Sequence, residues 1–328
     1  MNRLQRLNLR AGLLLVLLVG IGMDRAALAG QLQLPSSGWA SWEVPAAAGT
    51  GDWCCLAHYG RPARECPLDG PERGYSKRSE DQVDAVRLYA RFDGGQLRQL
   101  QMFAASCPVT ARSAIQDLGA VAVEPSLHWL QQQLAQRPAL REDLTAALSA
   151  HAGEAAQAAL LALAAPGAPR PQRQDALFWL ALNRGAAGAS ALEPFLSQDA
   201  DPEIRQHAAF ALSQTQSPRR SAALIRQGQQ DPSSEVRSQA WFWLAQTGAA
   251  EAESAIASAL KAEKDAEVRH QAIFALSQLP DDRAAPALGR VLEDRRLSLD
   301  DRKQALFWLG QSDSELAQRY LAEVLGSN

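Results

Sequence analysis

The sequence predicts a mainly α-helical protein, an α-solenoid of helical hairpins preceded by a small disulfide-bonded module that contains β-strands. Three observations predict this fold. An apolar pattern recurs every 32 or 33 residues in the C-terminal part, all four cysteines lie before residue 108, and a short apolar run opens the chain.

The first residues have the pattern of an export signal. Three arginines precede an apolar run over 11–22, and residues 27–29 have the small-x-small form of a cleavage site. The run is shorter than the roughly 20 residues that span a bilayer as a helix. We therefore expect residues 1–29 to be a signal peptide, with a retained amphipathic anchor as the alternative. The mature protein is then periplasmic or secreted, without membrane insertion, and no cysteine follows the cleavage site to carry a lipid.

The charge of the mature chain argues against nucleic acid as a partner. Removal of residues 1–29 takes away four Arg and one Asp, so 33 basic and 36 acidic residues become 29 and 35, a net charge of −6. A protein that neutralises phosphates needs a basic face.

Residues 30–108 are expected to form the small cysteine-containing module. Residues 86–92 and 97–103 alternate between apolar and polar side chains around Asp93-Gly94-Gly95, which predicts a β-hairpin. The helical part is expected to begin after about residue 106, with helices over 111–118 and 126–134.

The cysteines form an even set, Cys54, Cys55, Cys66 and Cys107, in a chain expected to be exported. Two disulfides are therefore predicted. A bond between the adjacent Cys54 and Cys55 is geometrically unfavourable. This leaves 54–66 with 55–107, or 54–107 with 55–66. A zinc site that uses these cysteines with His58 is the alternative, although the paired C-x-x-C spacing is missing.

Residues 109–328 are predicted to be a solenoid of about six repeats of 32 residues. The pattern R-x-x-A-x-F-x-L occurs five times, with a degenerate sixth copy upstream at Arg141. A second apolar segment follows each copy at the same spacing, so each repeat is two helices. The five phenylalanines are Phe178, Phe210, Phe242, Phe274 and Phe307.

The first helix of each pair is apolar nearly all round. An isolated amphipathic helix has a single apolar stripe, whereas a helix in a solenoid is covered by its own partner and by both neighbouring repeats. We therefore expect stacking to keep the Phe and Trp side chains away from water. Asp201-Pro202 and Asp231-Pro232 are predicted to begin such helices, each with an aspartate as N-cap.

The strings EIRQHAAFALSQ, EVRSQAWFWLAQ and EVRHQAIFALSQ resemble HEAT repeats, particularly the short bacterial HEAT-like type of phycobilin lyases. The resemblance covers about residues 140–325 and implies a right-handed α-solenoid. It also implies a polar ladder between repeats, made by an acidic residue and an arginine near the start of the first helix. At a spacing of six these are Asp199 with Arg205, Asp231 with Arg237, and Glu263 with Arg269.

The ladder is expected to lapse at Arg302, where one residue is inserted, and at Arg173, which lacks the preceding acid. An arginine beside a buried helix needs a carboxylate or carbonyl partner, because an unpaired buried charge is very costly. These arginines are therefore predicted to be structural and not catalytic.

Trp179, Trp243 and Trp308 follow the phenylalanine in alternate repeats, where the other repeats have alanine. Packing of large against small residues is the favoured explanation. The alternative is a set of aromatic anchors for a partner.

The second helices carry unlike side chains at corresponding exposed positions, which indicates a single irregular partner protein. The candidate partner-binding residues are Glu193, Arg226, Ser258 and Arg290. We expect a non-catalytic protein-protein interaction scaffold or adaptor in the bacterial cell envelope. Substitution of Arg226 and Arg290 is expected to weaken capture of the partner.

Two alternatives remain open. A lyase-type enzyme is implied by the family resemblance alone, since the five histidines are scattered and no Ser-His-Asp set or metal spacing occurs. A thiol- or metal-handling module is the other. No catalytic residue, metal or cofactor is predicted.

Overall fold

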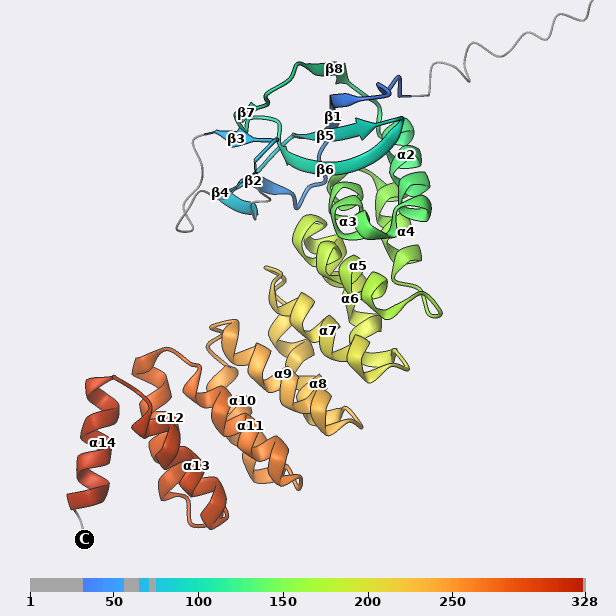
Figure 1. Ribbon diagram of the computed structural model, residues 1–328. Coiled ribbons are helices and arrows are strands. Elements are labelled where there is room, and N and C mark those ends of the chain that lie inside the picture. Colours follow the sequence, from blue (N-terminus) through green and yellow to red (C-terminus); the bar gives the residue numbers. More distant parts are fainter. Residues whose placement is uncertain (1–31, 56–64, 71–74, 327–328) are drawn as a thin grey trace, which may run out of the picture. The chain divides into compact units, whose positions relative to one another are not determined.

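The computed structural model describes residues 32–55, 65–70 and 75–326 (Figure 1). The expected signal peptide and His58 lie outside these residues. Within them, no helix combines the length and apolar character needed to cross a membrane.

The strands are β1 (Gly38–Pro45), β2 (Gly51–Cys55), β3 (Cys66–Pro67), β4 (Tyr75–Gln82), β5 (Ala85–Asp93), β6 (Gln96–Ala104), β7 (Val109–Thr110) and β8 (Ile115–Ala120).

The strands are followed by helices alone. They are α2 (Val123–Gln136), the short 3-10 helix η2 (Pro138–Leu140), α3 (Arg141–Ala150), α4 (Glu154–Leu163), α5 (Arg170–Asn183), α6 (Gly185–Gln198), α7 (Pro202–Ser213), α8 (Arg220–Gln230), α9 (Ser234–Gln246), α10 (Ala252–Ala262), α11 (Ala266–Ser277), α12 (Asp281–Glu293), α13 (Leu299–Gly310) and α14 (Glu315–Gly326).

A four-stranded sheet in the order β6-β5-β1-β8 forms the centre of the N-terminal module. β5 and β6 form the predicted hairpin, and Gly94 and Gly95 join them with φ of 57° and 73°, as a tight two-residue turn requires. The predicted helix over 111–118 is wrong, because Ile115–Ala120 is strand β8, paired parallel to β1. The strands therefore continue past residue 108 as far as Ala120.

Both faces of this sheet are covered, and successive residues of each strand point to opposite faces. Trp42 and Leu88 belong to the main core, which continues through the helices. Trp39 and Tyr89 belong to a second core that contains the four cysteines. The sheet thus lies between the disulfides and the helix stack.

A buried polar network joins the module to the first hairpins of the stack. The indole Nε1 of Trp42 donates to the hydroxyl of Ser126 at 2.8 Å, and that hydroxyl lies 2.8 Å from Nε2 of His151. Arg184 donates to the carbonyl of His151 at 2.5 Å, and Trp53 Nε1 to the side-chain amide oxygen of Asn183 at 3.3 Å. The module therefore closes the end of the stack, as a capping unit of a solenoid must.

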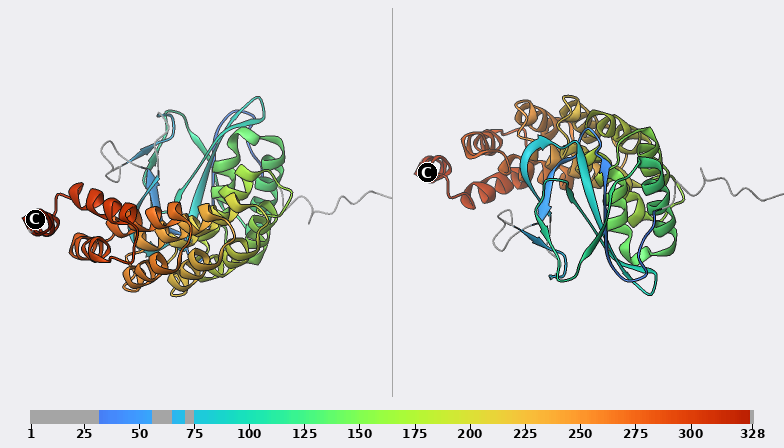
Figure 2. Two further views of the ribbon diagram at one scale, coloured as in Figure 1. Left: turned by 90° about the horizontal axis from the view of Figure 1, so that it is seen from below. Right: turned by 90° about the horizontal axis from the view of Figure 1, so that it is seen from above.

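Six hairpins follow within the described residues, α3/α4, α5/α6, α7/α8, α9/α10, α11/α12 and α13/α14 (Figures 1 and 2). We call the odd-numbered helices α3–α13 the inner layer and the even-numbered helices α4–α14 the outer layer. Inner helices of successive hairpins pack closely on each other, whereas outer helices of successive hairpins contact each other far less. The inner layer therefore has the tighter spacing between repeats.

The predicted helix starts are confirmed in one case and wrong in the other. Asp201 is the N-cap of α7 and accepts a hydrogen bond from the backbone N–H of Glu203. Asp231 instead follows the end of α8, and Ser233 is the N-cap of α9. The carboxylate of Asp231 is engaged between repeats, as described next.

Candidate functional site

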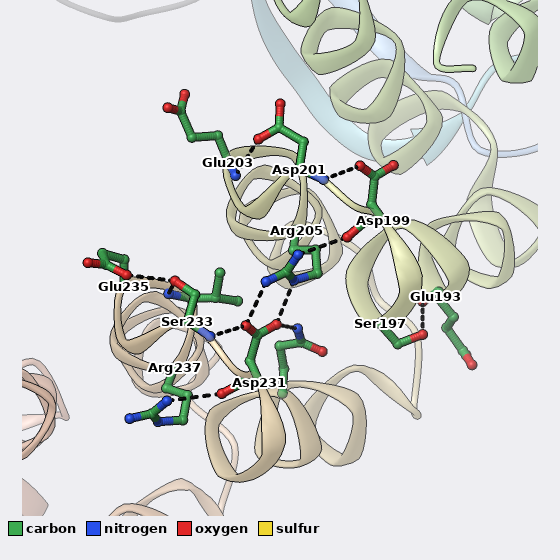
Figure 3. Close-up of polar contacts among 12 residues, drawn as sticks. Glu193, Ser197, Asp199, Asp201, Glu203, Arg205, Asp231, Ser233, Glu235 and Arg237 are labelled. Carbon is green, nitrogen blue, oxygen red and sulfur yellow. Dashed lines mark hydrogen bonds and ion pairs between the residues drawn. The ribbon is translucent and has the colours of Figure 1, made fainter. Parts of the chain in front are cut away.

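Ion pairs between repeats line the starts of the inner helices. The carboxylate of Asp231 accepts from Nε and Nη2 of Arg205 at 2.7 and 2.9 Å (Figure 3). In the next repeat, Glu263 accepts from Nε of Arg237 at 2.8 Å. Arg173 pairs with Asp199 in the same way. Each arginine thus binds the acidic residue of the following repeat.

The sequence spacing of six corresponds to a second contact. Nη1 of Arg205 donates to the backbone carbonyl of Asp199 at 2.8 Å, and Nη1 of Arg237 to that of Asp231 at 3.0 Å (Figure 3). Each acidic residue is therefore held twice, by its carboxylate and by its carbonyl. The predicted ladder exists, but the ion pairs of Arg173, Arg205 and Arg237 join residues 26 apart.

The ends of the ladder differ from the prediction. Arg173 has a partner, because the acid it needs lies in the next repeat. Arg269 pairs with Asp301, a residue of α13, at 3.1 Å. Nε of Arg302 is buried without a hydrogen-bond partner among the described residues, so the predicted lapse is confirmed there. The carboxylates of Asp231 and Asp301 are almost fully buried, so the ladder is structural.

The four partner-binding candidates all lie on outer helices. Arg226 and Ser258 are exposed, and Arg290 forms an ion pair with Glu253. Glu193 and Arg226 line a cavity of about 250 Å³ between α6 and α8. Ser258 lines a separate cavity of about 690 Å³ beside α9 and α10. These residues therefore do not form one site.

The inner layer carries a row of aromatic side chains, most of them partly exposed, which we call the aromatic row. The rings of Phe178 and Phe210 are stacked with centroids 5.9 Å apart, and those of Phe242 and Phe274 with centroids 5.8 Å apart. Trp243 lies 4.8 Å from Phe210. The row consists of Phe178, Trp179, Phe210, Phe242, Trp243, Phe274, Phe307 and Trp308.

The expectation that stacking keeps these rings away from water is wrong for the phenylalanines. Phe307 is 53% exposed and the other four are partly exposed, whereas the alanine and the leucine of the same R-x-x-A-x-F-x-L copies are buried. Of the three tryptophans of the row, Trp179 is buried, whereas Trp243 and Trp308 are partly exposed. When a predicted helix is apolar all round, its sequence pattern does not indicate which side chains will be exposed to solvent.

Acidic residues accompany the aromatic row. Glu203, Glu235, Glu267 and Asp300 each stand seven residues before a phenylalanine of the row, which places acid and ring on the same side of the helix. All four are exposed. We call them the acidic row. Figure 3 shows Glu203 and Glu235 on the side of the ladder opposite Glu193.

A cavity of about 450 Å³ connects the two rows. Its lining includes Glu203, Phe210 and Trp243, together with glutamines of three successive inner helices. These are Gln174, Gln206 and Gln239. The lining therefore combines ring faces, amides that both donate and accept hydrogen bonds, and a carboxylate.

The cysteines form two disulfides, Cys54–Cys107 and Cys55–Cys66. This is one of the two pairings that the sequence left open. Sγ of Cys66 lies 3.4 Å from Sγ of Cys54 and 3.3 Å from Sγ of Cys107. The sulfurs are close enough together for a metal, but in this oxidised form they are not the thiolates that zinc requires.

Ser126 and His151 resemble a nucleophile and its base, with Oγ and Nε2 2.8 Å apart. Both are completely buried, and Nδ1 of His151 lies 2.7 Å from the carbonyl of Ala147. Burial lowers the pKa of His151 to about 4. A substrate cannot reach this pair, so it holds the module to the stack.

The repeats are similar to a known family of repeats. A family model described as HEAT repeats matches residues 158–240 and 222–309. No curated protein is matched by the sequence. Human deoxyhypusine hydroxylase in complex with glycerol is a similar solved structure, with 19% identity and a TM-score of 0.27, covering 61% of this chain and 77% of the other. At that TM-score the likeness supports no inference about activity.

Proposed function

We propose that this HEAT-repeat protein is a non-catalytic protein-protein interaction scaffold in the bacterial cell envelope, which binds its partner on the inner layer. The observation that carries the proposal is the aromatic row. Five successive inner helices each leave a ring partly exposed, although burial of such a ring is strongly favourable. Exposed apolar surface that continues along a molecule is typical of interaction sites.

The two disulfides support an exported location, because such bonds persist in oxidising compartments. The buried Ser126–His151 pair gives no support to an enzyme. The outer-layer candidates, Arg226 and Arg290, are the competing location for the partner.

Affinity isolation of the tagged protein from its own envelope tests the proposal. We expect Phe242→Gln with Phe307→Gln to abolish recovery of a specific partner, because glutamine keeps the helix but removes the ring. Arg226→Ser with Arg290→Ser is the matched outer-layer control and should leave recovery unchanged. Circular dichroism of both variants is the control for folding. Loss of the partner in the outer variant alone would move the site to the outer layer, and recovery in both variants would refute the proposal.

A further inference from the structure

We propose that the inner layer binds an extended, cationic polypeptide segment in the polyproline II conformation, with Lys or Arg at every third residue. This inference rests on the proposed function and names the chemistry of the partner. It follows from the charges beside the aromatic row, the spacing of the inner helices and the cavity that joins the two rows.

The charge of the surface selects a cationic ligand. Glu235 and Glu267 are exposed and form no ion pair among the described residues; their hydrogen bonds come from Ser233 at 2.6 Å and Gln271 at 3.1 Å. The Ser233 hydroxyl lowers the pKa of Glu235, which keeps this carboxylate charged near neutral pH. The charge of Glu203 is partly neutralised by an ion pair with Arg170, and that of Asp300 by an ion pair with Lys303. Arg173, Arg205, Arg237 and Arg269 of the ladder are already paired.

The aromatic row adds to this selection. An arginine or lysine side chain stacks favourably on the face of an aromatic ring, and each acidic residue here precedes a phenylalanine by two helical turns. In the cavity of 450 Å³ the carboxylate of Glu203 and the rings of Phe210 and Trp243 line the same space. One cationic side chain can therefore reach a carboxylate and a ring at once.

The repeat spacing selects the conformation. Packed helices lie about 8–10 Å apart, and the inner helices α7, α9, α11 and α13 each present one acid and one phenylalanine. A polyproline II segment rises about 3.1 Å per residue and completes a turn in three, so equivalent side chains recur about every 9 Å. Its backbone carbonyls are unpaired, and Gln174, Gln206 and Gln239 line the cavity with amide donors for them.

Isothermal titration of the mature protein with synthetic (Arg-Pro-Pro)5 tests this assignment, with (Glu-Pro-Pro)5 and (Arg-Gly-Gly)5 as comparison peptides. We expect (Arg-Pro-Pro)5 to bind, (Glu-Pro-Pro)5 not to bind, and (Arg-Gly-Gly)5 to bind more weakly because glycine does not hold the extended conformation. Binding of the arginine peptides should weaken as salt rises, since the carboxylates are exposed.

The variant Glu235→Gln with Glu267→Gln should weaken (Arg-Pro-Pro)5 binding by about tenfold, roughly threefold for each exposed pair. The matched control is Glu154→Gln with Glu251→Gln, two exposed carboxylates at outer helices, which should not change binding.

Equal binding of (Glu-Pro-Pro)5, no binding of (Arg-Pro-Pro)5, or no effect of the inner variant would overturn the assignment. Equal binding of (Arg-Gly-Gly)5 would overturn the polyproline II part. If the partner still depends on Phe242 and Phe307 while these peptides fail, the scaffold proposal stands and only this inference is refuted.

Discussion

His151 shows how one buried side chain makes the free energy of unfolding depend on pH. Burial, reinforced by the nearby charge of Arg184, lowers its pKa to about 4, whereas a histidine in an unfolded chain titrates near 6.5. Between these values the unfolded chain binds a proton that the folded chain does not. The contribution of the neutral His151 to the free energy of unfolding is therefore complete above about pH 6.5 and is lost as the pH falls toward 4.

We expect the free energy of unfolding to fall by about 2 kcal/mol between pH 7 and pH 5 through this residue alone. Urea unfolding at the two pH values measures it. His151→Gln should lower stability at pH 7 and should show a smaller fall toward pH 5, whereas His128→Gln, at an exposed position, should keep the wild-type fall. An unchanged pH dependence in His151→Gln would contradict this account.

Gly228 and Trp241 are a matched pair at one junction. A Cβ added at Gly228 would lie 2.5 Å from the Trp241 ring, and equivalent positions in the preceding repeat hold Leu196 and Ala209. We expect Gly228→Ala to lower the free energy of unfolding by about 2 kcal/mol, the usual range for overpacking.

Gly228→Leu combined with Trp241→Ala reproduces the pair of the preceding repeat, and it should recover most of that loss. Thermal unfolding of the single and double variants is the measurement. A double variant less stable than Gly228→Ala would show that the pair is not interchangeable between repeats.

At the scale of the helix, the ladder determines how strongly each inner helix is held to the next. Removal of Arg205 leaves the almost fully buried carboxylate of Asp231 without its cation. We expect Arg205→Met to lower the free energy of unfolding by about 3 kcal/mol or more. Addition of Asp231→Asn should recover part of that loss, because it removes the buried charge.

Arg290→Met is the control, since Arg290 forms an ion pair with Glu253 at the surface. Such pairs contribute about 1 kcal/mol or less, so its unfolding midpoint in urea should stay close to that of the wild type. Equal effects of Arg205→Met and Arg290→Met would refute the structural role of the ladder.

The strands of the module bring three sulfurs together, and this predicts an exchange reaction. In Cys55→Ser the thiolate of Cys66 is free and lies close to both sulfurs of Cys54–Cys107. It can attack either sulfur and release the other as a thiolate. We expect peptide mapping under non-reducing conditions to find Cys66 bonded to Cys54 or to Cys107 in part of the sample.

Cys66→Ser is the matched variant, because it frees Cys55 instead. Sγ of Cys55 lies 3.8 Å from the carbonyl of Glu65 and is not part of the close group formed by the sulfurs of Cys54, Cys66 and Cys107. That disulfide should therefore stay intact in Cys66→Ser. Exchange to the same extent in both variants would contradict the role of the sulfur positions.

For the whole molecule, local patterns predicted the repeats and the hairpin but not the contacts between distant segments. Strand β8 exists because Ile115–Ala120 pairs with β1, far earlier in the chain, and its own sequence has no clear alternation. The ion pairs of the ladder were missed for the same reason, since Arg205 binds an acid 26 residues ahead. The right-handed coil of the solenoid stays a prediction.

The candidate site was only partly predictable. The 32-residue period located every phenylalanine of the aromatic row, and aromatic anchors were considered as an alternative for the tryptophans. The acidic row has the same period in Glu203, Glu235, Glu267 and Asp300, so this signal was available in the sequence. Partial exposure was not, because it depends on how closely successive inner helices approach.

The contacts between rings of neighbouring repeats also make tryptophan fluorescence a probe of the junctions between repeats. Trp243 lies 4.8 Å from Phe210, and Trp308 lies 4.7 Å from Phe274, so each indole senses one junction. A variant that retains only one of these two tryptophans would report by fluorescence on the one junction that this tryptophan contacts. Hairpins that unfold at different denaturant concentrations would then be distinguished, junction by junction, by the wavelength and intensity of the tryptophan emission.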